Sequence, residues 1–195
     1  MSVATRRIVF PEPQEYLDRE NDGEWRHEYV NGVIYAMAGG SENHNLIAGN
    51  LFANLKLGSP QQCRVFAFDM KVQISKAPEE RYYYPDVFVT CSERDRDRHS
   101  KSEPVLIIEV LSPNTERTDR IEKRDAYKLL PSVMEYVLVE QDFPFVEIYR
   151  RRTNWEREAV GPGAPIVLES VGLSLRFEQV YRQVDFPASH ARSGR

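Results

Sequence analysis

Two carboxylates near the middle of the chain could hold a metal ion together. Glu109 lies within the apolar run 104–112, where an unpaired ionised carboxylate would be very costly, so it must be protonated, paired with a cation or bound to a metal. Asp86 follows Pro85 on the preceding strand-like segment. If the two segments are neighbouring strands, the carboxylates could share one Mg²⁺, which binds few carboxylate oxygens and keeps several waters. Two simpler interpretations stay open: Glu109 as a hydrogen-bonded core residue, and Pro85-Asp86 as an ordinary turn.

The N-terminal third of the chain is predicted to position two further polar residues. Asn31-Gly32 lies between two β-prone runs and predicts a hairpin over 25–37, with Glu28 on its first strand. Ser41 is a suitable N-cap for a helix over 42–57, which would place His44 in the first helical turn.

The remaining segments predict one sheet with helices around it. The run 104–112 is apolar on both faces, which indicates a central strand covered on each side. The other predicted elements are a strand over 64–75, a strand over 82–91, a surface loop over 92–103, a charged helix over 118–130, a strand meander over 135–160 and a short helix over 177–181. This order predicts a mixed α/β or α+β domain.

Length and composition indicate the class of protein. The 195 residues fit one domain over 1–187, followed by a small polar tail at 188–195 that we expect to be disordered. The first 25 residues contain no apolar stretch longer than three, and no segment approaches the ~20 apolar residues of a membrane span, so we expect a cytoplasmic protein without a membrane partner. Cys63 and Cys91 form no CxxC pair, so we expect a reducing compartment and interpret the two side chains as buried apolar fillers.

The charge is distributed unevenly along the chain. The net charge of −4 provides no overall basic footprint for nucleic acid. However, residues 12–28 carry seven acidic and two basic side chains, whereas 117–128 carry five basic and three acidic ones. The net charge therefore does not exclude a nucleic-acid partner, but it predicts weak nonspecific binding that depends on a divalent ion.

An ordered set of motifs resembles the PD-(D/E)xK nuclease superfamily and, more closely, the Uma-type putative restriction endonucleases. The segments that carry the resemblance are the Glu28 hairpin with Asn31-Gly32, His44, Tyr84-Pro85-Asp86-Val87, Ile107 to Pro113, Lys123 with Tyr127, and Glu135-Tyr136. The resemblance extends over about 16–181. It implies a restriction-endonuclease-like core, with a central mixed sheet flanked by helices, and a Mg²⁺-dependent endonuclease acting on nucleic acid, which we expect to be DNA. Mn²⁺ is the expected substitute.

The resemblance also implies roles for individual residues. Asp86 and Glu109 would be the metal ligands. The superfamily pattern places a lysine at position 111, where this chain has Leu111, and Lys123 on the following helix would replace it. Lys123 would orient or activate water, or stabilise the charged phosphorane. Without the resemblance, a solvated positive face would explain Lys123 better.

Three further residues have two open interpretations each. Tyr127 lies one helical turn after Lys123 and could hold the lysine or a phosphate oxygen, or simply pack in the core. Glu28 could serve a second metal or the lysine, or be a half-exposed strand residue beside Arg26. His44 could contact the scissile phosphate or act as a general acid, or be an ordinary surface histidine.

The alternative function is a catalytically silent nucleic-acid-binding or oligomerisation module that keeps the nuclease fold, since fold alone does not determine function. We also expect a homodimer, because cleavage of duplex DNA at a specific site calls for two active sites. The apolar strands predicted over 135–160 support that expectation.

Overall fold

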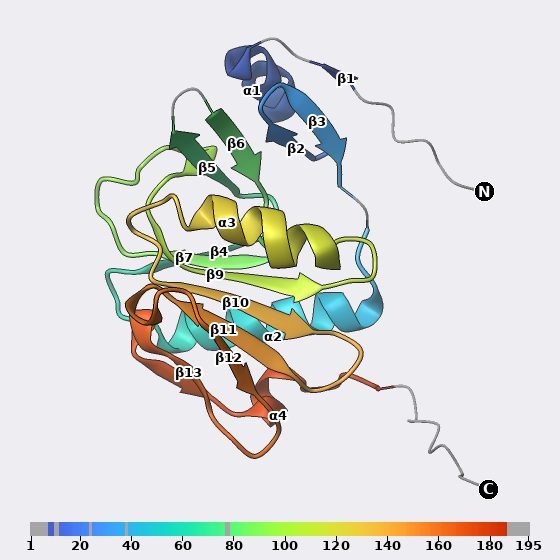
Figure 1. Ribbon diagram of the computed structural model, residues 1–195, viewed down its shortest axis with the longest axis vertical. Helices are drawn as coiled ribbons and strands as arrows, with labels where there is room; N and C mark the ends of the chain where they lie inside the picture. Colours follow the sequence, from blue (N-terminus) through green and yellow to red (C-terminus); the bar gives the residue numbers. More distant parts are fainter. Residues whose placement is uncertain (1–7, 10–11, 24, 38, 77–78, 187–195) are drawn as a thin grey trace, which may run out of the picture.

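Two six-stranded sheets form the body of the molecule in the computed structural model (Figure 1). The structure describes residues 8–9, 12–23, 25–37, 39–76 and 79–186, so the predicted tail at 188–195 lies outside it. Within these ranges, no helix combines the length and the apolar character that a membrane span requires.

Sheet A contains the N-terminal hairpin. Its strands, in spatial order, are β1 (Ile8–Val9), β3 (Val33–Ala36), β2 (His27–Val30), β6 (Glu79–Tyr83), β5 (Lys71–Lys76) and β8 (Ser100–Lys101). The hairpin prediction is confirmed: Asn31 and Gly32 both have positive φ, as a two-residue turn between twisted strands requires. Helix α1 (Pro13–Asp22) packs on the hairpin through the buried Tyr16, which contacts Tyr29 and Tyr82.

Sheet B contains the predicted central strand. Its strands, in spatial order, are β12 (Arg157–Val160), β11 (Val146–Arg150), β10 (Glu135–Glu140), β9 (Pro104–Leu111), β7 (Val87–Thr90) and β4 (Arg64–Ala67). Strand β9 pairs parallel with β10 and antiparallel with β7, so both of its edges are hydrogen-bonded. A hairpin of β13 (Ile166–Leu168) and β14 (Leu173–Leu175) and the short helical turns η2 (Arg151–Thr153) and η3 (Glu169–Val171) complete the C-terminal part.

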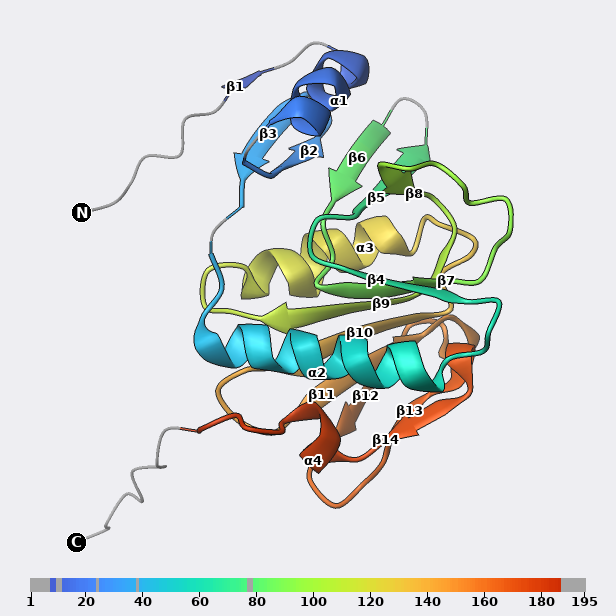
Figure 2. The ribbon, with the colours of Figure 1, turned by 180° about the vertical axis from the view of Figure 1, so that it is seen from behind.

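Helices cover both faces of sheet B. Helix α2 (Glu42–Gly58) crosses one face, together with α4 (Phe177–Val180) (Figure 2). The other face carries a π-helical turn, η1 (Thr118–Lys123), that continues into α3 (Arg124–Tyr127). Each face has its own apolar core: Ile108 faces α2, whereas Ile107 faces α3 and the strands β5 and β6. The apolar run at 104–111 is therefore explained by burial on both sides.

Three of the predicted elements were wrong in extent. The strand predicted over 64–75 is two strands in different sheets, because Phe68 has a φ of 65° that no extended strand tolerates. The strand predicted over 82–91 also divides between the sheets at Pro85, which has no N–H for a sheet ladder. The predicted single sheet is thus two sheets. The predicted surface loop over 92–103 contains β8 and a buried Asp95 that accepts two backbone N–H groups.

The two cysteines pack against the apolar core as partly buried side chains, but they form a disulfide that was not predicted. The register that pairs Arg64 with Thr90 brings Cys63 opposite Cys91, with their Cα atoms 4.0 Å apart. The bond joins the ends of β4 and β7. Since the thiols are not free, they no longer support the predicted reducing compartment.

Candidate active site

Asp86 and Glu109 lie side by side where β7 begins. Asp86 immediately precedes β7, and the register that pairs Val87 with Ile108 brings it next to Glu109 on β9. The Asp86 backbone N–H donates to Oε2 of Glu109 at 3.3 Å, and the Val110 N–H donates to Oδ2 of Asp86 at 2.6 Å. The prediction that these segments are neighbouring strands is confirmed.

Lys123 is buried among three carboxylates. Its side chain is 7% exposed, and its Nζ lies 3.0 Å from Glu28, 3.2 Å from Asp119 and 3.3 Å from Glu109. The π-helical turn η1 aims Asp119 and Lys123, four residues apart, into the same cavity. Such turns are rare and often occur at functional sites. The interpretation of Lys123 as part of a solvated positive face was wrong.

Tyr127 holds a carboxylate rather than the lysine. The side chain is fully buried, and its hydroxyl donates to Oε1 of Glu109 at 3.2 Å. Its ring packs edge-on against Tyr83. Because Tyr127 does not line the cavity, a role in binding a phosphate oxygen is not supported; it packs in the core and positions Glu109.

Glu28 and His44 line the same cavity and contact different residues of the site. Glu28 on β2 pairs with Lys123 and accepts the Tyr84 N–H at 3.3 Å, whereas Arg26 lies near Asp69 instead. The Ser41 hydroxyl accepts the His44 N–H and caps α2, as predicted. The His44 Nε2 lies 3.3 Å from Oδ2 of Asp86, and its side chain is only 17% exposed, so it is not an ordinary surface histidine.

The cavity between these elements has a volume of about 630 Å³ and is lined by five of the six predicted residues: Glu28, His44, Asp86, Glu109 and Lys123. Among the other lining residues are two buried polar side chains that were not predicted. Asp119 is 2% exposed, and its four-residue spacing from Lys123 was the available sequence signal. Gln141 is 5% exposed and accepts the Ser41 hydroxyl; no pattern in the sequence indicated it.

Carboxyl groups outnumber basic side chains in the cavity, which is lined by Glu28, Asp86, Glu109 and Asp119 but only by Lys123 and His44 of the basic residues. Burial raises the pKa of Glu109 well above its usual range; Lys123 opposes this shift, and Asp119, Asp86 and Glu28 add to it. Burial by itself lowers the pKa of Lys123, but Glu109, Glu28 and Asp119 outweigh that effect and raise it. The pKa of His44 is likewise raised by Asp86 against the opposing effect of burial. Lys123 therefore stays protonated, and the carboxyl groups around it have too few cations to pair with.

The donor set suits an ion that keeps most of its water. Asp86 and Glu109 offer two carboxylates on one cavity wall, which matches the few protein ligands that Mg²⁺ takes. The described ranges contain no group of three or more His, Cys, Asp or Glu side chains placed to hold a metal. A closed cage of the structural-zinc kind is thus not built from these residues.

Comparison with known proteins identifies the family. The family model Uma2, described as "Putative restriction endonuclease", matches residues 13–178. The chain belongs to the Uma2 family. Two relatives of this Uma2 chain come from Synechocystis sp. and are both described as uncharacterized. The protein slr1290 is 36% identical over 180 residues, covering 89% of this chain and 93% of its own length; sll1609 is 36% identical over 155 residues, covering 77% and 85%.

A solved structure shares the fold of this Uma2 chain. It is described as a putative nuclease belonging to DUF820 from Anabaena variabilis and aligns with a TM-score of 0.65, covering 86% of this chain and 96% of its own. The sequence identity is 22%, so the likeness shows the fold. The predicted family and the mixed α+β, nuclease-like fold are confirmed.

Proposed function

We propose that this Uma2 chain is a Mg²⁺-dependent endonuclease that hydrolyses phosphodiester bonds in nucleic acid, with DNA as the expected substrate. The observation that carries the proposal is the position of the Glu109 carboxylate, which contacts the Lys123 ammonium and also accepts the N–H of Asp86. A buried cation and two adjacent carboxylates at one cavity wall are groups that metal-assisted phosphodiester hydrolysis uses.

Asp86 and Glu109 are the residues that would hold the ion, with Mn²⁺ as the expected substitute. When bound, a divalent ion polarises the phosphate and lowers the pKa of water. Its charge would also offset the excess of carboxylates in the cavity.

The chain's own residues would orient the reaction around that ion. The Lys123 ammonium would stabilise the negative charge that builds on the phosphate oxygens, or position the attacking water. Glu28 and Asp119 hold Lys123 in place and keep it charged, and Tyr127 fixes the carboxylate of Glu109. His44, paired with Asp86, would be the group that donates a proton at this wall of the cavity.

A cleavage assay on supercoiled plasmid and on oligonucleotides, with Mg²⁺, Mn²⁺ or chelator, tests the proposal. We expect wild-type cleavage that chelator abolishes, and a loss of at least about 100-fold in Glu109→Gln and Lys123→Gln. Lys128→Gln is the matched control, because Lys128 lies on the same helical segment and pairs with Asp125 outside the cavity. Equal cleavage by Lys123→Gln and Lys128→Gln would reject the assigned site.

One observation favours the second candidate, a catalytically silent nucleic-acid-binding module. Oδ2 of Asp86 already has two partners, the Val110 N–H and His44. The silent module predicts that nucleic acid binds without being cleaved under any divalent ion, and that Asp86→Ala leaves binding intact or improves it by removing a negative charge.

Homodimer formation stays a prediction. Of the strands over 135–160 on which it rested, β10 and β11 are interior strands of sheet B whose side chains fill the core, and β12 is an edge strand that is mostly exposed.

A further inference from the structure

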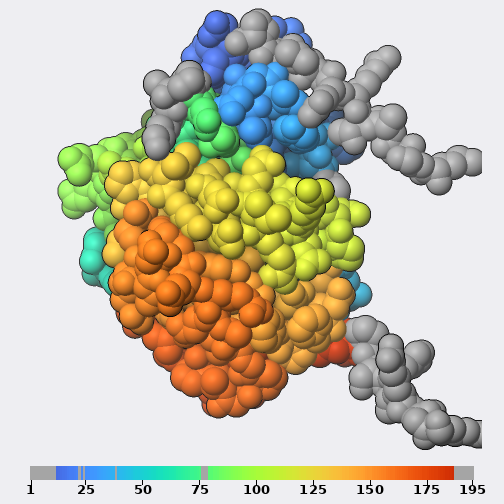
Figure 3. Space-filling model, in the orientation of Figure 1, coloured from blue at the N-terminus to red at the C-terminus, as the bar shows by residue number. Residues whose placement is uncertain are grey.

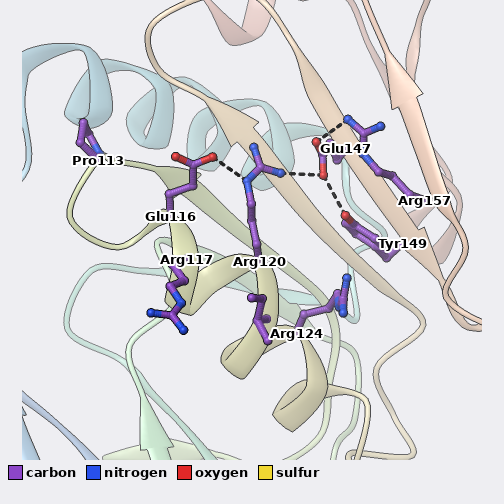
Figure 4. A pocket seen from close by; sticks show the side chains of 9 residues that line it. Pro113, Glu116, Arg117, Arg120, Arg124, Glu147, Tyr149 and Arg157 are labelled. Atoms are coloured by element: carbon purple, nitrogen blue, oxygen red, sulfur yellow. Dashed lines mark hydrogen bonds and ion pairs between the residues drawn. The ribbon is translucent and has the colours of Figure 1, made fainter.

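A second cavity of about 630 Å³ lies on another face of η1, between this helical segment and the strands β11 and β12 (Figure 4). We call it the arginine groove, after Arg117, Arg120, Arg124 and Arg157, which line it. Pro113 lines both this groove and the active-site cavity, so the two hollows adjoin at the turn before η1. In Figure 3 the yellow surface of η1 and α3 meets the orange surface of the later strands on the viewed face.

The four arginines outnumber the two acidic residues of the groove, Glu116 and Glu147. Glu147 is 3% exposed and is already saturated: it accepts bonds from Arg120, Arg157 and Tyr149, as Figure 4 shows. Glu116 pairs with Arg120 at 2.8 Å. Both carboxylates therefore serve Arg120 and Arg157, and neither contacts the other two arginines.

Neither carboxylate of the groove neutralises Arg117 or Arg124, so both guanidinium groups can pair with a ligand. Within the part of the chain that the structure describes, the side chain of Arg117 forms no hydrogen bond or ion pair, and the residue is exposed. Arg124 contacts Oδ1 of the exposed Asp125 through both Nε and Nη2, each at a long 3.4 Å. Its guanidinium lies 5.3 Å from the ring centre of Tyr149, which holds it against the groove wall.

We propose that the arginine groove binds the phosphate backbone of the nucleic-acid strand beside the scissile phosphate, an inference that rests on the proposed function of the adjoining cavity. The planar guanidinium fork matches phosphate oxygens, and backbone contacts of this kind position a strand without reading its sequence. Tyr149, the aromatic residue of the groove, is covered by Arg124, so the groove offers charge to phosphates rather than a platform for stacked bases.

The test is the affinity of the full-length chain for duplex and single-stranded oligonucleotides in metal-free buffer, measured by fluorescence anisotropy over a salt series. We expect Arg117→Gln/Arg124→Gln to bind about tenfold more weakly and to lower the slope of log K against log salt by about 2. Arg152→Gln is the matched control, since Arg152 is an exposed arginine that pairs with Glu169 away from the groove. Arg117→Glu alone, at an exposed position, should weaken binding further than Arg117→Gln.

Binding and cleavage separate this inference from the proposed function. The arginine groove is not a backbone site if the double variant binds as tightly as wild type, or loses no more affinity than Arg152→Gln does. This conclusion holds even if the wild-type chain cleaves DNA. The inference is also overturned if wild type binds neither oligonucleotide, or if inorganic phosphate competes as well as an unlabelled strand does. Reduced binding by the double variant supports the groove even if no cleavage is detected. The absence of cleavage would contradict the proposed function but not this inference.

Discussion

The Nζ atom of Lys123 on η1 lies 3.0 Å from Oε1 of Glu28 on β2, and this ion pair joins the N-terminal hairpin of sheet A to the helical layer on sheet B. The same ammonium also contacts Glu109 and Asp119. Three buried or half-buried carboxylates thus depend on one cation. Removing that cation would leave these largely buried carboxylates to repel one another.

Lys123→Gln should therefore lower the free energy of unfolding by about 3 kcal/mol, because it leaves uncompensated charge in a buried site. Lys128→Gln, which removes a pair with the exposed Asp125 and a contact with the Trp155 ring, should change it by less than about 1 kcal/mol. Urea unfolding in metal-free buffer measures both. Adding Glu28→Gln to Lys123→Gln should recover part of the lost free energy of unfolding. If the double variant is instead less stable than Lys123→Gln by about another 3 kcal/mol, unpaired charge is not the cause of the loss.

Divalent ions should stabilise the folded chain if Asp86 and Glu109 hold them. Mg²⁺ or Mn²⁺ at about 100 times its dissociation constant should add about 2.7 kcal/mol, and chelator should reverse the gain. Asp86→Asn and Glu109→Gln should each reduce it, whereas Glu116→Gln, outside the cavity, should not. Thermal unfolding with and without the ion provides the measurement. An unchanged gain in the Asp86→Asn/Glu109→Gln double variant would place the ion elsewhere.

Glu147 should contribute stability that depends on pH. Burial by itself raises its pKa, but the bonds from Arg157, Tyr149 and Arg120 outweigh burial and bring the pKa below its usual 4.5. The contribution is fully present above that unfolded value and is lost as the pH falls through the lowered folded value. Glu147→Gln should thus cost about 2 kcal/mol near neutral pH, and the difference from wild type should shrink below about pH 4.5. Urea unfolding at several pH values tests this; a difference that grows on acidification would contradict the sign.

A disulfide between Cys63 and Cys91 should stabilise the folded chain in a way that two free thiols would not. Cys63 and Cys91 are 28 residues apart, and a cross-link of that span stabilises a domain by about 3 kcal/mol, mainly through the unfolded chain. Cys63→Ser/Cys91→Ser and the reduced wild type should therefore unfold at similarly lower denaturant concentrations than the oxidised wild type. Thiol titration under denaturing conditions supplies the control, and two free thiols in the untreated protein would refute the bond.

Local sequence signals were enough to predict the elements that present the site. Asn31-Gly32 predicts the hairpin of Glu28, Ser41 predicts the cap beside His44, and the two-sided apolar run predicts the central strand of Glu109; all three are confirmed. Each of these signals depends on residues a few positions apart. The same kind of signal failed at Phe68, because alternation continues through a positive φ that transfers the chain from sheet B to sheet A.

The sequence by itself was enough to predict the family, most of the elements and most of the charged residues of the site. The elements were predictable because periodicity and turn preferences depend on side chains that are close together in the chain. Only the tertiary structure decided how those charges meet. Burial of Lys123 among carboxylates from β2, β9 and η1, the entry of Asp119 into the cavity and the pairing of Cys63 with Cys91 all depend on segments distant in the chain. Contacts of this kind are set by sheet register and helix packing, which no single segment specifies.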